Sequence, residues 1–197
     1  VLDIDEDAYR SGRVSTRLFG YLTVPEDRRR LQSRKSGTPL GQKAAQNLIA
    51  LNIVDRMQDD LFYLIGPGTT TRPILENLSL TGSLLGVDVI RNRKLIKKDA
   101  AEADILKIVE NHPFQIIITP IGGQGYLFGR GNHQISPEII KMAGKENLIV
   151  GATLEKIGSL QGRPLLVDTG DPELDFSLSG YIRVIIGYRQ EIVCKIE

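Results

Sequence analysis

The chain has one cysteine, Cys194, two histidines and no tryptophan in 197 residues. One cysteine excludes an internal disulfide framework and is typical of a reducing compartment, so we expect a cytoplasmic protein in which Cys194 is a small core residue. No apolar run is long enough to span a membrane, and no segment has the pattern of a signal peptide. The net charge of +1 indicates no general affinity for nucleic acid or membranes.

Residues for covalent or metal-dependent catalysis are equally scarce. The histidines, His112 and His133, are isolated in the sequence, and no Gly-x-Ser-x-Gly motif is present. A loop histidine without cysteine or histidine neighbours is a poor metal ligand, so we assign no metal-ligating residue. The sequence predicts binding chemistry and identifies no catalytic residue.

The chain divides by pattern into a β segment with a basic connection, residues 1–38, and an α/β domain, residues 39–197. The alternative is one continuous C-terminal domain. The first residue is Val1, and residues 1–5 already have the pattern of a strand. We therefore expect the chain to begin inside a longer protein.

From residue 39 onward, apolar residues alternate between helical and strand periods. This alternation predicts an α/β fold with a mainly parallel sheet and flanking helices. Asp99 and Glu102 have the spacing of a capping box. We expect helices at residues 39–57, 71–78, 99–110 and 136–144, and strands at residues 61–65, 83–90, 95–96, 114–119, 147–152, 164–167, 181–186 and 191–196.

The strand at residues 61–65 runs into a glycine- and threonine-rich segment, which we call the first glycine loop (residues 66–71). Free backbone amides at a helix start, with threonine hydroxyls beside them, can hold a phosphate. The alternative is a strand-to-helix turn with a threonine N-cap. The segment is no P-loop, because the spacing differs and no lysine follows. The binding candidates here are Gly66, Gly68, Thr69, Thr70 and Thr71.

The second glycine loop (residues 122–132) follows the apolar strand at residues 114–119 and contains five glycines, one arginine and no acid. Glycines let backbone amides approach a ligand closely, and an arginine can offer a fork of donors to phosphate. The alternative is a glycine-rich structural crossover. The binding candidates are Gly122, Gly123, Gln124, Gly125, Arg130 and Asn132.

Three acids remain open to more than one interpretation. Asp168 and Asp171 follow the strand at residues 164–167 and can hold Mg²⁺, accept ribose hydroxyls or act as a base. Asp171 precedes Pro172 and has the pattern of an N-cap. Asp88 is either a site residue or a polar side chain facing solvent. We keep Asp168 as a binding candidate.

Four motifs together resemble the ATP-NAD kinase-like family, in particular the C-terminal half of its acetoin-catabolism branch. They are Gly-Pro-Gly-Thr-Thr-Thr at residues 66–71, Leu-Gly-Val-Asp-Val at 85–89, the glycine-rich segment at 119–132 and Leu-Val-Asp-Thr-Gly-Asp at 166–171. The similarity covers nearly the whole chain, and the long glycine segment is its most specific part.

The resemblance implies a cytoplasmic, Rossmann-like, two-domain kinase for NADP biosynthesis, forming a homo-oligomer. Such a kinase phosphorylates the adenosine ribose 2′-hydroxyl of NAD with ATP or polyphosphate and a divalent metal such as Mg²⁺. The family motif Gly-Gly-Asp-Gly-Thr, whose aspartate is the expected catalytic base, is absent from this sequence. The resemblance places it in an N-terminal domain, so we expect this chain alone to be inactive.

Two other functions fit the same residues. A sugar-phosphate-binding or isomerase-like domain would bind ribose or hexose phosphates without adenine, and would place an acid or a lysine for proton transfer. A non-catalytic nucleotide sensor or dimerisation module would bind no nucleotide strongly. The arginine within the second glycine loop favours a nucleotide ligand.

Overall fold

A computed structural model describes residues 2–4, 16–18, 40–121 and 123–197. The chain forms two compact units, Val1–Ser33 and Arg34–Glu197. In the first unit, β1 (Leu2–Ile4) pairs antiparallel with β2 (Thr16–Leu18), so part of the expected β segment is β structure. The other residues of that segment and the basic connection lie outside the described residues. The expected domain boundary after residue 38 stays a prediction.

The second unit is built on a seven-stranded sheet with the order β5-β4-β3-β6-β7-β8-β9. The four central strands are parallel neighbours, and β4, β5 and β9 join antiparallel at the two edges. The predicted α/β fold with a parallel centre is therefore confirmed. The strands are β3 (Phe62–Ile65), β4 (Val87–Arg91), β5 (Lys94–Ala100), β6 (Phe114–Ile118), β7 (Leu148–Gly151), β8 (Gly180–Gly187) and β9 (Gln190–Ile196).

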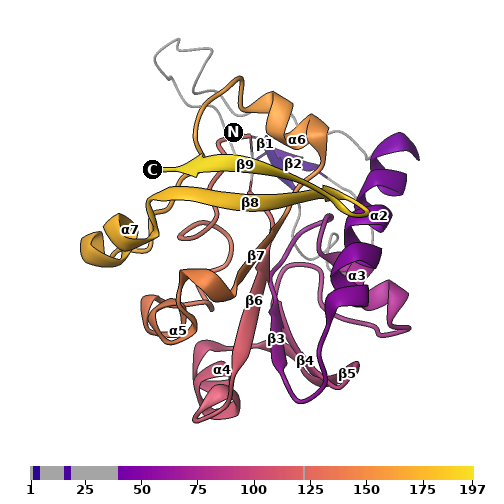
Figure 1. Ribbon diagram of the computed structural model, residues 1–197, viewed down its shortest axis with the longest axis vertical. Coiled ribbons are helices and arrows are strands. Elements are labelled where there is room, and N and C mark those ends of the chain that lie inside the picture. Colours follow the sequence, from indigo (N-terminus) through magenta and orange to yellow (C-terminus); the bar gives the residue numbers. More distant parts are fainter. Residues whose placement is uncertain (1, 5–15, 19–39, 122) are drawn as a thin grey trace. The chain divides into compact units, whose positions relative to one another are not determined.

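Helices cover both faces of this sheet (Figure 1). Helices α2 (Leu40–Arg56) and α3 (Arg72–Asn77) pack on one face; α4 (Glu102–Val109), α5 (Pro137–Ala143) and α7 (Pro172–Leu178) pack on the other. Strand β3 shows why two cores form: Phe62 and Leu64 belong to one hydrophobic cluster, and Tyr63 and Ile65 to the other. Successive side chains of a strand point to opposite faces, so an all-apolar strand is buried on both.

The remaining helices are short: η1 (Lys145–Asn147), which precedes β7, and α6 (Leu154–Ser159), which follows it. The sequence analysis expected neither. None of the helices in the described ranges combines the length and the apolar character that a membrane span requires.

Three sequence-based expectations about local structure are wrong. The capping box at Asp99 and Glu102 is not formed: α4 begins after Ala101, whose backbone N–H donates to Asp104 Oδ2 at 3.2 Å, and Asp99 ends up in β5. The strand expected from residue 83 begins only at Val87. Residues 164–167 form isolated bridges to neighbouring segments and not a strand of their own.

Asp88 explains the late start of β4. Its side chain is buried, with 1 % of its surface exposed, so the solvent-facing interpretation is wrong. Its Oδ2 accepts from the backbone N–H of Ser83 at 2.7 Å, and its Oδ1 from that of Asp99 at 2.9 Å. The first hydrogen bond ties Ser83, which precedes β4, to Asp88, and the second ties Asp88 to β5. Asp88 therefore braces the β4–β5 edge of the sheet.

Candidate functional site

Both glycine loops follow central strands whose carboxyl ends lie side by side. Strands β3 and β6 are adjacent and parallel, with Ile65 opposite Ile117. From β3 the chain continues to β4 and β5 on one side, and from β6 it continues to β7 and β8 on the other. The junction is therefore a topological switch point, the place where open α/β sheets bind ligands beyond the carboxyl ends of their strands.

The two glycines of the first loop are needed for packing. The backbone N–H of Gly66 donates to the carbonyl of Ile117 at 2.8 Å, and a Cβ on Gly66 would lie 3.2 Å from that oxygen. Gly68 has a φ of +136°, and a Cβ there would lie 2.7 Å from Cγ2 of Thr119. Glycine therefore lets the first loop lie directly against the end of β6.

The three threonines of this loop have different partners. Thr71 Oγ1 donates to the carbonyl of Gly66 at 2.6 Å and makes no side-chain N-cap bond to α3. Thr69 Oγ1 accepts from Nε2 of Gln46 at 3.2 Å. Thr70 is 1 % exposed, and its Oγ1 has no hydrogen-bond partner among the described residues. Of the three hydroxyls, that of Thr70 is therefore buried without a partner among the described residues, which is uncommon for a buried polar group.

The second glycine loop is braced from within. The side-chain amide of Asn132, a buried residue, donates from Nδ2 to the carbonyl of Leu127 at 2.8 Å, and its Oδ1 has no partner among the described residues. Gly129 has a φ of +85°, and a Cβ there would lie 1.6 Å from the carbonyl oxygen of Asp168. The loop thus folds tightly onto the segment that follows residue 167.

The outer residues of this loop are more accessible. Gly123 is exposed, with no atom within 4 Å of an added Cβ, and Gln124 is half-buried. Gly125 is buried and has a φ of +83°; a Cβ there would lie 2.9 Å from Leu160. Gly122 lies outside the described residues. Gly123 and Gln124 are therefore better placed than Gly125 to meet a ligand.

Arg130 lies between an aromatic ring and a carboxylate. Its guanidinium carbon is 4.5 Å from the centre of the Tyr126 ring, and Nη2 is 3.8 Å from Oδ2 of Asp168. The Arg130 and Asp168 side chains are both more than half exposed, and such pairs contribute little to stability. A phosphate can therefore compete for Arg130. Two residues that the sequence analysis proposed separately are brought together here.

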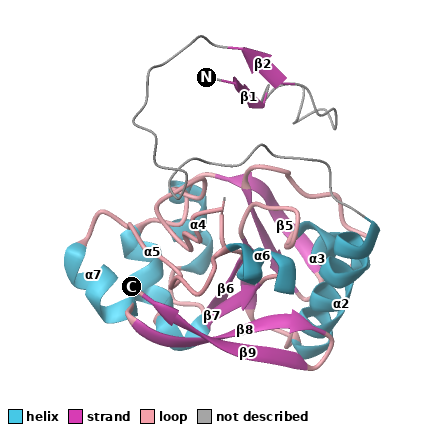
Figure 2. Ribbon diagram, turned by 90° about the horizontal axis from the view of Figure 1, so that it is seen from above, coloured by secondary structure: helices cyan, strands magenta, loops and turns pink. Residues whose placement is uncertain are grey.

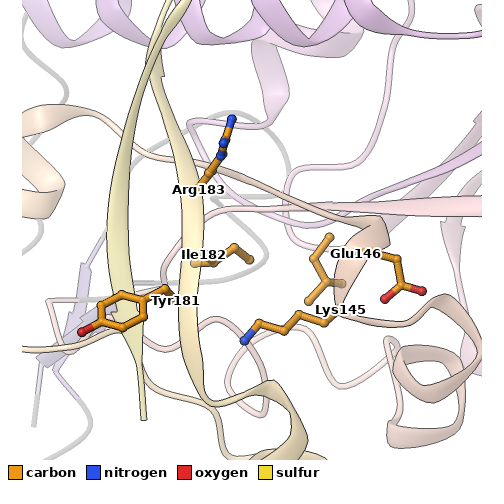
Figure 3. Close-up of a pocket in the computed structure, with 6 residues that line it drawn as sticks. Lys145, Glu146, Tyr181, Ile182 and Arg183 are labelled. Carbon is orange, nitrogen blue, oxygen red and sulfur yellow. The ribbon is translucent and has the colours of Figure 1, made fainter.

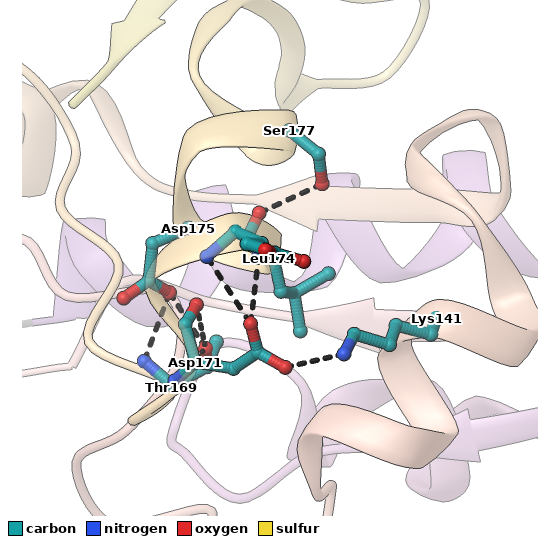
Figure 4. A network of polar contacts seen from close by, with 7 residues as sticks. Lys141, Thr169, Asp171, Leu174, Asp175 and Ser177 are labelled. Atoms are coloured by element: carbon teal, nitrogen blue, oxygen red, sulfur yellow. Dashed lines mark hydrogen bonds and ion pairs between the residues drawn. The ribbon is translucent and has the colours of Figure 1, made fainter.

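A polar network holds the segment that carries Asp168 (Figure 4). Asp171 Oδ1 accepts from the backbone N–H groups of Glu173 and Leu174 at 3.1 and 3.0 Å, so its predicted N-cap role at α7 is confirmed. Lys141 of α5 forms an ion pair with the same carboxylate. These contacts hold the pKa of Asp171 below its usual value, with Lys141 as the largest cause. Asp171 is therefore a structural residue.

Lys156, in α6, is a candidate site residue that the sequence analysis missed. Its Nζ donates to Oγ1 of Thr119 at 3.1 Å and to the carbonyl of Pro120 at 3.0 Å. Helix α6 follows β7, so a third strand end contributes to the same edge, as Figure 2 also shows. Burial lowers the pKa of this ammonium to about 8. A strand followed by Thr-x-x-Lys was the available signal, but only the neighbouring strand end gives it meaning.

The comparison with known families agrees with this arrangement. The family model of the ATP-NAD kinase C-terminal domain matches residues 58–196, well over half of the chain. The chain belongs to the ATP-NAD kinase C-terminal domain family. Searches of curated proteins and of solved structures gave no match. The family resemblance is thus confirmed, and the acetoin-catabolism branch stays a prediction.

Mg²⁺, which this kinase family implies, does not find a ready set of ligands here. Asp168 is the predicted carboxylate nearest the second glycine loop, and it faces Arg130. In the described part of the chain no group of three or more His, Cys, Asp and Glu residues gathers as a metal site. Mg²⁺ prefers one or two carboxylates together with substrate phosphates. We derive no step through a metal held by these residues.

An open surface pocket of this family member lies elsewhere (Figure 3). It is found where β7 and β8 begin, at the opposite end of these strands from the glycine loops, and none of its residues belongs to those loops. We place the candidate site at the strand ends because the switch point, both glycine loops and Lys156 meet there. The pocket is lined by Lys145, Glu146, Leu148, Tyr181, Ile182 and Arg183.

Proposed function

We propose that this chain is the nucleotide-binding C-terminal half of an NAD kinase-like phosphotransferase. Joined to an N-terminal domain that supplies the catalytic base, it would present the adenosine ribose 2′-hydroxyl of NAD to a phosphoryl donor such as ATP. The twelve glycine-loop and Asp168 candidates are proposed as ligand contacts. The acetoin-catabolism branch, a homo-oligomeric assembly and a cytoplasmic location belong to the same proposal.

The observation that carries the proposal is the meeting of the two glycine loops at the β3–β6 switch point, within the residues that the family model matches. Phosphoryl transfer depends mainly on positioning and on neutralising charge. Backbone amides, Arg130 and Lys156 can do both without a nucleophile. This fits a half-site that binds a nucleotide and leaves the chemistry to another domain.

One observation favours the sugar-phosphate or isomerase alternative. That function needs an acid or a lysine placed for proton transfer, and Lys156 is a half-buried lysine with a pKa lowered to about 8. A base near neutrality suits proton abstraction. The ligand therefore has to discriminate between the two functions: a dinucleotide for one, a sugar phosphate without adenine for the other.

Calorimetric titration of the 197-residue chain with NAD, ATP and ribose 5-phosphate, each with and without Mg²⁺, tests the proposal. We expect NAD to bind and Arg130→Ala to weaken that binding about tenfold, because a charged hydrogen bond to phosphate is lost. Arg183→Ala removes an exposed guanidinium from β8, at the other end of the sheet, and is the matched control.

Binding of ribose 5-phosphate alone would favour the isomerase-like function. A folded chain that binds none of the three ligands would favour the non-catalytic sensor or dimerisation module. Where NAD binds, the chain joined to its N-terminal domain should convert NAD to NADP in the presence of a phosphoryl donor, and the chain alone should not.

A further inference from the structure

The ammonium group of Lys156 has only neutral partners in the described part of the chain. Its two acceptors, Oγ1 of Thr119 and the carbonyl of Pro120, carry no charge, and the ion pairs of the described residues do not include Lys156. Glu155, next to it in α6, is exposed. Removing a positive charge from water is unfavourable unless an opposite charge compensates it. The position of Lys156 therefore indicates an anion that the described residues do not supply.

Thr119 connects Lys156 to the first glycine loop. Its hydroxyl is the acceptor 3.1 Å from Nζ, and its methyl group is the atom that a Cβ on Gly68 would meet at 2.7 Å. The side chain of Thr119 thus lies between Lys156 and Gly68, although these two residues belong to segments that follow different strands. The ammonium lies at the end of β6, between the first glycine loop and the start of the second.

Thr70 is a second polar group near these strand ends that has no partner among the described residues. Its hydroxyl is buried and has no partner among the described residues, whereas almost all buried polar groups in proteins have one. Its Cγ2 would lie 4.0 Å from a Cβ on Gly151, the last residue of β7. Thr70 therefore lies beside the strand end from which the chain runs into α6.

We infer that Lys156 binds an anionic group of the ligand, a phosphate of the bound nucleotide, at the end of β6. The inference rests on the proposed nucleotide-binding function and deepens it. An ammonium has three N–H donors, and two of them have acceptors within the chain. The third remains for a phosphate oxygen.

This assignment separates Lys156 from Arg130. Charge interactions are stronger where water is excluded, and Lys156 is half-buried whereas the Arg130 side chain is 54 % exposed. Lys156 is then the principal phosphate contact and Arg130 an outer one.

The test compares Lys156→Met, which keeps the length of the side chain, with Lys156→Arg, which keeps the charge. Lys107→Met is the control, since Lys107 is exposed on α4, which leads to the amino end of β6. Calorimetry with NAD and with inorganic pyrophosphate gives affinities. In parallel, the ¹³Cε resonance of Lys156, assigned by its loss in Lys156→Met, is titrated with pH in the presence and absence of each probe.

We expect Lys156→Met to weaken NAD and pyrophosphate about tenfold or more, and more than Arg130→Ala does, while Lys156→Arg loses less. Both probes should raise the midpoint of the Lys156 titration above about 8. A residue with a purely structural role would leave that midpoint unchanged.

The other outcomes separate the role of Lys156 from the nucleotide-binding function. If NAD binds equally to wild type and Lys156→Met and leaves the midpoint unchanged, the nucleotide function stands and the role of Lys156 is overturned. If pyrophosphate binds through Lys156 and NAD does not bind, the anion site stands and the nucleotide function fails. If a folded chain binds neither probe, both are overturned.

Discussion

Replacing Lys156 by methionine should change how the stability of the protein depends on pH. The folded protein holds the pKa of Lys156 at about 8, against 10.5 for an unperturbed lysine, because burial disfavours the charged form. Below about pH 8 the lysine is protonated in both the folded and the unfolded state, and folding bears the full cost of desolvating the charge. Between about pH 8 and 10.5 the folded state loses the proton while the unfolded state keeps it, so this cost disappears.

The size of the effect follows from the two pKa values. One pKa unit corresponds to about 1.4 kcal/mol, so a shift from 10.5 to about 8 corresponds to about 3 kcal/mol of destabilisation at neutral pH. Methionine carries no charge and bears none of this cost. The stability advantage of Lys156→Met over wild type should therefore shrink by about 3 kcal/mol as the pH rises from about 7 to about 10.5.

Urea unfolding followed by circular dichroism, at several pH values across that range, measures this difference. Any difference in strength between the hydrogen bonds that Lys156 donates as an ammonium and as an amine, to Thr119 and Pro120, is already contained in its folded-state pKa. Tyr63, whose pKa is raised mainly by burial, lowers stability at high pH in both proteins and cancels. Lys107→Met controls for the loss of one positive charge. A difference between wild type and Lys156→Met that stays constant with pH would refute the desolvation of Lys156.

Two further predictions concern the loops that frame the site. Gly129→Ala should destabilise the protein by more than about 2 kcal/mol in urea unfolding, since its Cβ would overlap the Asp168 carbonyl at a φ of +85°. Gly123→Ala, which meets no atom within 4 Å, should stay within about 0.5 kcal/mol of wild type, and equal effects of the two would contradict the packing argument. Asp171→Ala should lower Tm by about 2–4 °C, because α7 loses its N-cap, and calorimetric scanning measures it. Lys141→Met, which removes only an exposed ion-pair partner, should lower Tm less; the reverse order would show that the ion pair dominates.

Local pattern was sufficient to predict most of the secondary structure in the described domain. Strand β6 is an almost unbroken apolar run. Helix α5 begins with Pro137 directly after Ser136 and is followed by Gly144, so each element is specified by residues within it or beside it. The errors arose where a distant contact overrides the local pattern. Asp88 accepts one hydrogen bond from the backbone of Ser83 and one from that of Asp99 in β5, and no periodicity within residues 83–86 reveals either.

The glycine loops could likewise be found from sequence, but the reason for their glycines could not. Gly68 is required by the methyl group of Thr119, and Gly129 by the carbonyl of Asp168, each from a segment remote in the chain. The sequence analysis assigned the glycines to ligand approach, with a structural turn or crossover as the alternative, and could not name the segments that the glycines contact. Strand order decides which segments face each other, and that order was not contained in the local pattern.

By itself, the sequence determined the alternation of strands and helices, the two glycine loops and the family resemblance, because each depends on residues close together in the chain. Only the tertiary structure brought Lys156 to Thr119 and Pro120, Arg130 to Asp168, and the first glycine loop to the end of β6. The parallel pairing of β3, β6 and β7 is what aligns their carboxyl ends. The burial and the charge of the side chains at these strand ends depend on segments that local sequence cannot place next to one another.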